Sequence, residues 1–345
     1  MVRIGIICPS EIAFRRFLPS LSELSDLRFI GIAIANVDEW FGVTKSEIAD
    51  KVIQDTINGE RSKAGMFLEN YGGEIFDSYT QLINSDKIDA VYLPLPPALH
   101  YKWAKLALLS GKHVLIEKPA TTSKRDTQEL ILHAKQRRLA IHENYMFTFH
   151  DQLKEIKRHV ESGEIGDVRL YRISFGFPRR AVNDFRYNKE LGGGAILDCG
   201  GYTIKYASML LGETAKLTYA QSNYLEGFDV DLYGSAALVN ESGTTVQVAF
   251  GMDNSYRCDL EIWGSKGYLT TGRVLTAPSG FVPEVIIKTE SQCITRKLPV
   301  DDAFKKSIQR FQDCIGNDKM RENNYADILK QADLIDDFVT KCNKR

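Results

Sequence analysis

Glu117-Lys118-Pro119 carries the residue types in this chain that are best placed to act on a small polar ligand. The triplet follows the apolar run at residues 114–116, which has the character of a buried strand. In an open α/β sheet, ligands bind beyond the carboxyl ends of the strands, so an ammonium group there faces a cofactor or a substrate. Pro119 restricts the backbone of Lys118 and therefore the direction of its side chain. A lone lysine at a strand end is more often simply solvated. The surrounding sequence must therefore decide whether Lys118 has a functional role.

The elements around Lys118 alternate between strands and helices. We expect strands at residues 3–7, 27–35, 88–93, 114–116 and 139–143, with helices at 10–24, 99–110 and 123–138 between them. This alternation predicts parallel pairing with right-handed crossovers. The strand ahead of Lys118 is therefore expected to belong to a doubly wound sheet.

The second half of the chain has a different hydrophobic pattern. Residues 168–173 and 244–250 alternate with period two, and residues 258–270 read as a hairpin. We expect an open, mostly antiparallel sheet, covered by helices at about residues 194–211, 304–314 and 324–340 or by a second subunit. The expected domains are a dinucleotide-binding domain at residues 1–122 and an α/β domain for substrate binding and oligomerisation at residues 123–345.

Bulk composition narrows the class of protein. The chain has 345 residues, 43% hydrophobic and 26% charged, with a formal net charge of −1. This balance provides no general attraction to nucleic acid or to a membrane surface, and no apolar run approaches the roughly 18 residues of a membrane span. The six cysteines and six histidines show no zinc-binding spacing, and the start of the chain has no export signal. We expect a cytoplasmic protein with a small-molecule partner and no metal.

The turn after the first strand is where a Rossmann domain places its glycine-rich loop against a pyrophosphate. Here the three usual glycine positions hold Cys8, Ser10 and Ala13. These residues are still small, and Ser10 can donate through its hydroxyl and its amide. Ser10, Glu11 and Ile12 are therefore candidate cofactor contacts, although a plain helix cap at Ser10 explains the turn equally well.

The end of the second strand decides between the two nicotinamide cofactors. Asn36 stands where an acidic residue would hold the ribose of NAD, and no Ser-Arg pair suited to the NADP phosphate is present. About twenty extra residues follow, and after them Arg61 and Lys63 could return to a 2′-phosphate or could simply be solvated. Asp38 is an acidic residue close to Asn36, so NAD is also possible as the cofactor. We expect NADP or NAD, with NADP slightly favoured.

Three blocks together carry a resemblance to a known family: residues 91–100 (VYLPLPPALH), 111–119 (GKHVLIEKP) and 191–202 (LGGGAILDCGGY). In order and spacing they resemble the Gfo/Idh/MocA oxidoreductases, and the likeness covers essentially the whole chain. The resemblance implies an N-terminal Rossmann domain and a C-terminal α/β domain with a large, mostly antiparallel sheet that is often used for dimer contacts. A homodimer or homotetramer is the expected assembly.

Other segments look most like nucleotide-sugar 3-ketoreductases, which act on dTDP-linked 3-keto-deoxysugars. They are residues 12–19, 144–147 and 184–187. By this resemblance, further cofactor contacts are expected at Leu95, Pro96, His100, Glu117 and Asn144.

The resemblance also implies two catalytic positions. Lys118 would hydrogen-bond the reacting oxygen and border the nicotinamide, and the second position, four residues after Asp198, is Tyr202, where many relatives have histidine. Hydride addition to a ketone develops negative charge on oxygen, so a proton donor and a nearby positive charge are needed. An ammonium near a tyrosine favours the phenolate and lowers its pKa from about 10 towards working pH.

Three further residues are expected to touch the substrate. Asp198 would orient a sugar hydroxyl, or only the start of its helix. Arg179 and Arg186, with the neighbouring Arg180, could bind a diphosphate bidentately, although surface arginines without a ligand are common.

The expected activity is NAD(P)-dependent oxidoreduction of a CH–OH group, with Tyr202 as proton donor. One alternative is a free-sugar, inositol or dihydrodiol dehydrogenase. Another is a non-catalytic dinucleotide sensor or corepressor of the same fold, but such a sensor has no chemical reason to keep both Lys118 and Tyr202. The sugar, its nucleotide and the direction of the reaction stay open.

Overall fold

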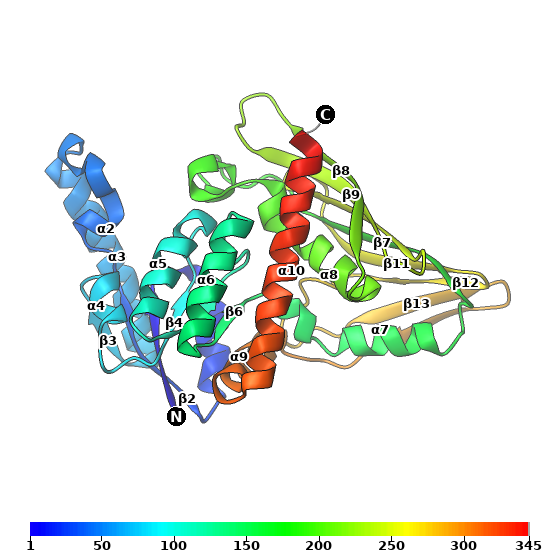
Figure 1. The fold of residues 1–345 in the computed structure, drawn as a ribbon, viewed down its shortest axis with the longest axis horizontal. Coiled ribbons are helices and arrows are strands. Elements are labelled where there is room, and N and C mark those ends of the chain that lie inside the picture. Colours follow the sequence, from blue (N-terminus) through cyan, green and yellow to red (C-terminus); the bar gives the residue numbers. More distant parts are fainter. Residues whose placement is uncertain (344–345) are drawn as a thin grey trace. The chain divides into compact units, whose positions relative to one another are not determined.

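The computed structural model describes residues 1–343, which group into two compact units. The first unit contains residues 1–121, 125–144 and 307–328, and the second contains residues 122–124, 145–306 and the chain from residue 329 onward. Figure 1 shows the fold and labels many of the elements. Within the described chain, none of the helices combines the length and the apolar character that crossing a membrane requires.

The first unit is built on a six-stranded sheet in the order β3-β2-β1-β4-β5-β6. All of its strand pairs are parallel. The central strands are apolar and buried on both faces, because helices cover both sides of such a sheet. The strands are β1 (Val2–Ile7), β2 (Leu27–Ala33), β3 (Glu74–Phe76), β4 (Ala90–Leu93), β5 (His113–Ile116) and β6 (Ile141–Glu143). The predicted Rossmann-type sheet is confirmed, although the second strand ends at Ala33, two residues before the expected end.

The helices of this unit connect successive strands. The helix after β1 begins at Glu11 and continues through the π-helical η1 (Ala13–Phe17) into α1 (Leu18–Ser22). The extra residues after β2 form α2 (Val37–Phe41), η2 (Gly42–Glu47) and the first part of α3 (Asp50–Tyr71). The remaining connections are α4 (Tyr79–Ile83), α5 (Pro97–Leu109) and α6 (Lys124–Arg137).

Residues beyond the expected boundary at residue 122 also pack with the first unit. β6 pairs with β5 and extends the parallel sheet. Much later in the chain, α9 (Ala303–Gly316) and the first part of α10 (Asp318–Asn343) return to this sheet, where Phe311 is fully buried and the Tyr325 hydroxyl donates to the Leu139 carbonyl. Backbone pairing and buried aromatic rings therefore group these segments with residues 1–121.

The second unit contains an eight-stranded sheet in the order β14-β13-β12-β11-β7-β10-β9-β8. Among the described strands of this second sheet, only the pair formed by β7 and β10 is parallel. The strands are β7 (Val168–Gly176), β8 (Lys216–Tyr224), β9 (Asp231–Val239), β10 (Thr245–Gly251), β11 (Arg257–Gly264), β12 (Gly267–Thr271), β13 (Glu284–Thr289) and β14 (Cys293–Lys297). The predicted mostly antiparallel sheet and its hairpin at β11 and β12 are confirmed.

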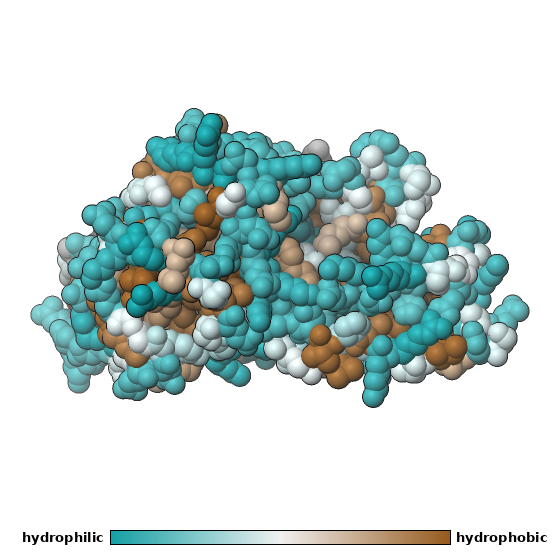
Figure 2. All heavy atoms as spheres, turned by 90° about the horizontal axis from the view of Figure 1, so that it is seen from below, coloured by the Kyte–Doolittle hydropathy of each residue, from teal (hydrophilic) through white to brown (hydrophobic). Residues whose placement is uncertain are grey.

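The two faces of this sheet differ in character. Inward side chains such as Ile173, Val248 and Leu260 join the buried core beneath η6 (Ile196–Gly200) and α8 (Gly201–Leu211), and α7 (Gln152–Glu161) packs against the same core. Outward residues include exposed large side chains, among them Trp263 and Tyr268. Figure 2 shows one face of the molecule, on which polar side chains predominate and apolar ones gather in scattered patches.

Candidate functional site

The turn after β1 replaces the usual glycines without losing the turn geometry. Cys8 takes a φ of 78°, the left-handed region that favours glycine, and its amide donates to the Ala33 carbonyl at 3.1 Å. The Ser10 amide donates to the Cys8 carbonyl at 2.9 Å, and the Ser10 hydroxyl accepts from the Ala13 amide at 3.2 Å. Ser10 is therefore the N-cap of the helix. Burial raises the pKa of the Cys8 thiol to about 12, so the thiol is un-ionised at neutral pH.

The helix start still offers a place for an anion. Among the described residues, no group accepts a hydrogen bond from the backbone amides of Glu11 and Ile12, and both residues are exposed. Free amides at a helix N-terminus carry partial positive charge. This turn therefore fits a pyrophosphate even without its glycines, and the capping role of Ser10 does not compete with it.

Asn36 begins α2 directly after β2. Its side chain accepts from the Glu39 amide at 2.8 Å, and the Glu39 carboxylate accepts from the Asn36 amide at 3.1 Å. The same carboxylate accepts from the amides of Tyr79 and Thr80 at the start of α4. Glu39 was not among the predicted site residues, and it joins two helix starts at the carboxyl ends of β2 and β3.

Arg61 lies on α3 and forms an ion pair with Asp77, which follows β3, at 2.6 Å. Its side chain is 51% exposed and that of Asp77 is 69% exposed, so the pair contributes at most about 1 kcal/mol. Lys63, the other predicted phosphate contact, pairs with the buried Glu60 at 2.6 Å. Arg61 is thus the cation at this edge of the sheet that a phosphate could more easily draw away from its partner.

His100 links the loop after β4 to the loop after β5. Its Nε2 lies 2.8 Å from the Leu95 carbonyl oxygen, which immediately precedes Pro96, and its Nδ1 lies 2.9 Å from the Pro119 carbonyl oxygen. Burial lowers the pKa of His100 to about 4, so the neutral ring donates to only one of these oxygens. Both ring nitrogens face the chain itself, so the contribution of His100 to a cofactor site would be to hold the two loops.

Glu117 lies at the carboxyl end of β5 with its carboxylate inside the unit. Oε1 accepts from the Tyr92 hydroxyl and from the Asn144 side-chain amide, both at 2.7 Å. Burial raises the pKa of Glu117, while Asn144, Tyr92 and the ammonium of Lys118 oppose the shift. Lys118 is half-buried and comes directly after it, joined to Pro119 by a cis peptide bond. The structure therefore brings Glu117 and Asn144, two of the predicted cofactor contacts, together next to Lys118 in the sequence.

Tyr202 occupies the first turn of α8 in the second unit. Its ring packs edge-on against Tyr145 and Phe175, each at 5.3 Å between centroids, and lies 5.6 Å from Phe147. The hydroxyl of Tyr145 comes so close to Gly201 that a side chain there would collide with it. This aromatic environment limits the directions available to the Tyr202 side chain.

Arg186 is held between two carboxylates. Its Nε donates to Asp198 at 2.7 Å, and its Nη1 donates to Asp184 at 3.1 Å. Burial acts to lower the pKa of the guanidinium, but Asp198 and Asp184 outweigh it and raise the pKa. Because two carboxylates already neutralise it, Arg186 is less available to a diphosphate than the sequence suggested. Its clear structural effect is to fix Asp198, one helical turn before Tyr202.

Arg179 lies in a more open setting. It pairs with Asp253 through two hydrogen bonds of 3.2 and 2.6 Å and lies over the Phe228 ring. Its side chain is 47% exposed. Arg180 stacks over Phe177. Arg179 can therefore exchange the Asp253 carboxylate for another anion at a low cost in free energy.

Asp231 was missed by the sequence reasoning. It is the first residue of β9 and is buried, and its Oδ2 accepts from the Ile196 amide at 2.9 Å, so it caps the helix that carries Tyr202. Gly194 has a φ of 119° and passes so close to this carboxylate that a Cβ would collide with it. Burial raises the pKa of Asp231 to about 6. An acid at the start of an alternating strand gives no signal of such a role.

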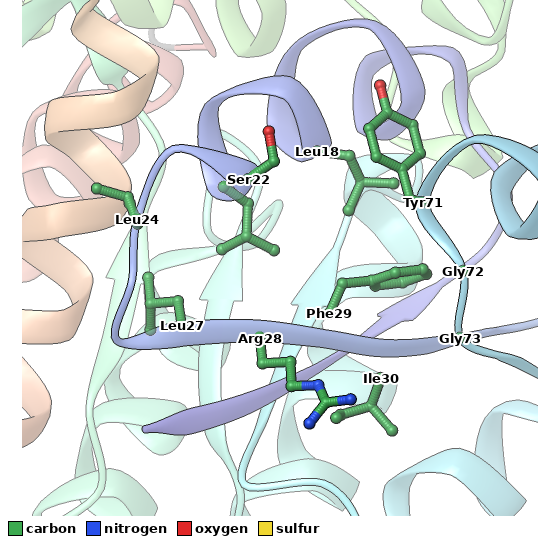
Figure 3. Close-up of a pocket in the computed structure, with 11 residues that line it drawn as sticks. Leu18, Ser22, Leu24, Leu27, Arg28, Phe29, Ile30, Tyr71, Gly72 and Gly73 are labelled. Atoms are coloured by element: carbon green, nitrogen blue, oxygen red, sulfur yellow. The ribbon is translucent and has the colours of Figure 1, made fainter.

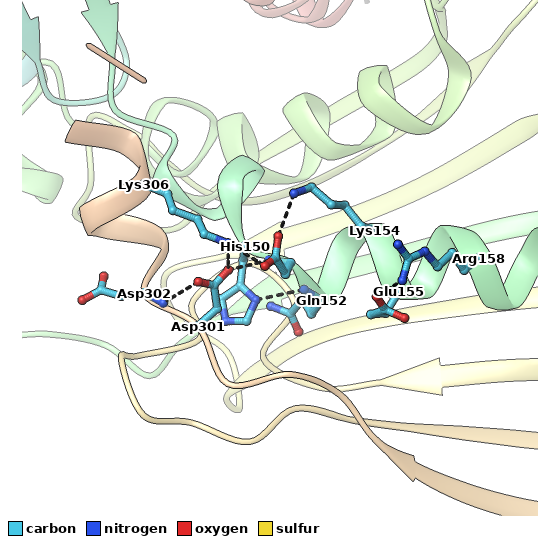
Figure 4. Close-up of polar contacts among 9 residues, drawn as sticks. His150, Gln152, Lys154, Glu155, Arg158, Asp301, Asp302 and Lys306 are labelled. Atoms are coloured by element: carbon cyan, nitrogen blue, oxygen red, sulfur yellow. Dashed lines mark hydrogen bonds and ion pairs between the residues drawn. The ribbon is translucent and has the colours of Figure 1, made fainter. Parts of the chain in front are cut away.

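Two other polar or hollow features lie away from these residues. A cavity of about 470 Å³ is lined by α1, by the first half of β2 and by residues 71–73 (Figure 3). It lies at the amino end of β2, opposite the edge where a Rossmann cofactor binds. In the second unit, Lys306 pairs with Asp151 at 2.6 Å and with Asp301 at 2.7 Å, and the amide of Gln152 donates to His150 (Figure 4). These contacts hold residues 301–306 against the start of α7.

Family models match both halves of the chain. Residues 39–145 match the model described as "Oxidoreductase family, NAD-binding Rossmann fold", and residues 153–270 match the "GFO/IDH/MocA C-terminal domain". The chain belongs to the Gfo/Idh/MocA oxidoreductase family. The resemblance of the three sequence blocks is thereby confirmed.

Curated relatives extend this match over nearly the whole length. The dTDP-3,4-didehydro-2,6-dideoxy-alpha-D-glucose 3-reductase of Actinomadura kijaniata is 34% identical over 335 residues, which are 97% of this chain and 94% of the relative. The enzyme of the same name from Streptomyces violaceoruber is 35% identical over 346 residues, 97% of this chain and 94% of the relative.

Solved structures agree with this family assignment. A 3-ketoreductase from Actinomadura kijaniata in complex with NADP and TDP-benzene superimposes with a TM-score of 0.88 at 34% identity, covering 99% of this chain and 98% of that chain. Variants of that protein with a tyrosine changed to phenylalanine or a lysine changed to alanine have also been solved. An aldose-aldose oxidoreductase from Caulobacter crescentus, at 19% identity and a TM-score of 0.81, covers 99% of this chain and 98% of that chain and shares the fold.

Proposed function

We propose that this oxidoreductase transfers a hydride between NADP(H) or NAD(H) and the 3-keto group of a nucleotide-linked deoxysugar. The observation that carries the proposal is the identity of 34% and 35%, over nearly the full chain, to two reductases of dTDP-linked 3-keto sugars. By the sequence resemblance, Lys118 and Tyr202 would take the family's two catalytic positions in this chain.

The cofactor, when bound, supplies the hydride. The amides of Glu11 and Ile12 would hold its pyrophosphate, with Ser10 shaping the turn. Leu95, Pro96 and Asn144 follow the ends of β4 and β6 and would border the nicotinamide half, with His100 holding the loops. On the adenosine side stand Asn36, as the start of α2, and Arg61, whose exposed pair with Asp77 a 2′-phosphate could replace.

Tyr202 would donate its hydroxyl proton to the ketone oxygen during reduction and accept a proton in the reverse direction. Lys118 would place its ammonium against the same oxygen and stabilise the developing negative charge. Glu117, held by Tyr92 and Asn144, would fix the backbone from which Lys118 projects.

The nucleotide diphosphate requires cations in the second unit. We assign the direct contact to Arg179, because its pair with Asp253 is exposed, and assign to Arg186 the task of holding Asp198 towards a sugar hydroxyl. Arginine suits a diphosphate because its planar guanidinium donates two parallel hydrogen bonds.

The protein is further proposed to act in the cytoplasm as a homodimer or homotetramer. Its cysteines are all free in the described structure, as expected in a reducing compartment. The outward face of the eight-stranded sheet presents Trp263, Tyr268 and Ile286, which would be covered by a second copy. Light scattering after gel filtration measures the assembly directly.

The test of the function is oxidation of NADPH and of NADH with a dTDP-linked 3-keto-deoxysugar, followed at 340 nm. We expect turnover with this substrate and none with the same sugar lacking its nucleotide. Turnover of free sugars or inositols alone would instead assign a free-polyol dehydrogenase, and tight cofactor binding without any turnover would assign a sensor.

A further inference from the structure

A chain of buried hydrogen bonds runs inward from Glu117, the residue beside Lys118. The Asn144 side-chain amide donates to Glu117 at 2.7 Å, and the Ser307 hydroxyl donates to the Asn144 carbonyl oxygen at 2.8 Å. His142 Nε2 lies 2.9 Å from the Ser307 hydroxyl, and His142 Nδ1 lies 3.2 Å from the Asn324 Oδ1. All five residues belong to the first unit, and four of them are at least 92% buried.

For this orientation of the Asn144 amide, counting hydrogens along the chain of bonds gives the charge of His142. The Asn324 Nδ2 donates to the Ile141 carbonyl at 2.5 Å, which turns its Oδ1, an acceptor, towards His142 Nδ1. Ser307 has one hydroxyl hydrogen and gives it to Asn144, so it can only accept from His142 Nε2. Both ring nitrogens must then carry hydrogen. In this arrangement His142 is an imidazolium and Glu117 is a carboxylate.

A second arrangement satisfies the same contacts with the same number of protons. If the Asn144 amide turns by 180°, its NH₂ donates to Ser307, and Ser307 donates to an unprotonated His142 Nε2. The Asn144 oxygen then faces Glu117, which must carry a proton to donate. His142 keeps hydrogen on Nδ1 for Asn324 and is neutral. The two groups are therefore either both charged or both neutral.

We infer that Glu117 and His142 share a single proton through Asn144 and Ser307, and that His142 and Ser307 are positioning residues which set the charge and amide orientation beside Lys118. The groups that face Glu117 are the Tyr92 hydroxyl on β4, Asn144 after β6, and the ammonium of Lys118. Among those that face His142 are Asn324 on α10, Ser307 on α9 and the Phe311 ring at 6.3 Å.

Burial disfavours the two isolated charges, whereas Lys118 favours the carboxylate. The consequence for the proposed ketoreductase is that the charge next to Lys118 depends on a histidine inside the domain. That consequence rests on the proposed function, but the shared proton does not.

The experiment is ¹⁵N NMR of the histidine rings in the full chain, because the two ring nitrogens of an imidazolium resonate close together and those of a neutral ring lie far apart. We expect His142 in the unaltered protein to be an imidazolium or the neutral Nδ1–H form. Glu117→Gln imitates the protonated acid, so it should fix His142 in the neutral Nδ1–H form from pH 5 to pH 9. A neutral Nε2–H ring in the unaltered protein, or an imidazolium in Glu117→Gln, would overturn the inference.

Glu143→Gln is the matched control, because Glu143 is a buried carboxylate next to His142 on β6 whose Oε1 accepts from the Ala120 amide. It should leave the His142 signals unchanged; an effect equal to that of Glu117→Gln would mean a general electrostatic influence and would refute the shared proton. If Glu117→Gln does not fold, Asn144→Ala breaks the chain at its next member and carries the same expectation of a neutral Nδ1–H ring. These readouts need no turnover, so an inactive enzyme would contradict the proposed function and leave this test intact.

Discussion

Replacing Asp231 by asparagine should make the protein more stable at neutral pH and remove a pH dependence of its stability. The carboxylate is 6% exposed and caps the helix that carries Tyr202 by accepting from the Ile196 amide at 2.9 Å. No cation is among the causes that set its pKa; backbone amides alone oppose the effect of burial. Asparagine has nearly the same shape and can keep the capping oxygen without the buried charge.

The magnitude follows from the pKa. Burial raises the pKa of Asp231 from its ordinary 3.8 to about 6 in the folded protein. A difference of roughly two pH units corresponds to about 3 kcal/mol at about 1.4 kcal/mol for each unit. Because the folded pKa lies above the unfolded one, this stability is fully present below pH 3.8 and is lost as the pH rises through about 6. The asparagine variant has no such proton to lose.

Urea unfolding of both proteins between pH 4 and pH 8 tests this reasoning. The difference in unfolding free energy, variant minus unaltered protein, should rise by about 3 kcal/mol between pH 4 and pH 7. Asp229→Asn, two residues earlier and exposed, is the matched control and should show no such rise. A flat difference for Asp231→Asn would refute the buried, uncompensated carboxylate.

Four further predictions concern the proposed site and its support. Lys118→Ala and Tyr202→Phe should each lower kcat by about 10²-fold or more while changing the Kd of the cofactor little, since general acid catalysis contributes this much; unimpaired turnover in Tyr202→Phe would exclude the hydroxyl as proton donor. Arg61→Ala should weaken NADPH more than NADH in fluorescence titrations, and equal losses would show that Arg61 does not read the phosphate. Cys8→Gly should relieve about 1 kcal/mol of backbone strain at φ 78° and tighten dinucleotide binding, whereas a drop in melting temperature with weaker binding would show that packing of the thiol outweighs the strain. Arg186→Ala should cost about 3 to 5 kcal/mol in unfolding free energy, because it leaves the largely buried Asp198, 13% exposed, without its partner. The control Arg179→Ala, from an exposed pair, should cost at most about 1 kcal/mol, and similar costs for both would contradict the difference in burial.

Sequence reasoning succeeded where local pattern and tertiary structure agree. The short apolar runs before Cys8, Pro94 and Glu117 are strands that a parallel sheet buries on both faces, so their length and composition suffice to predict them. The positions that follow these strands were predictable for the same reason, because the carboxyl ends of parallel strands share one edge. The period-two segments of the second sheet were equally clear.

Long-range partners could not be predicted. Helical periodicity shows that α9 has an apolar face but not which surface receives it, so the contact of Ser307 with Asn144 and His142 has no local signal. The same holds for Arg186 and Asp231. A charged residue in a loop or at the start of a strand reads as solvent-exposed unless the partner that buries it is known, and these two meet their partners only when η6 packs on the sheet.

The residues proposed for catalysis are each supported by acids that are partly or fully buried, and not by apolar packing alone. Asp198 and Asp231 fix the start of the helix that carries Tyr202, one through Arg186 and the other through a backbone amide, and the positive end of a helix favours both carboxylates. Glu117 holds the backbone next to Lys118 in the same way, because its carboxylate accepts hydrogen bonds from two neutral donors. Cations and neutral donors both favour the charged form of a carboxylate, and burial opposes them. At Glu117 and Asp231 burial outweighs the groups that favour the carboxylate and raises the pKa of each, so protonation of these two acids would weaken the support of Lys118 and of Tyr202.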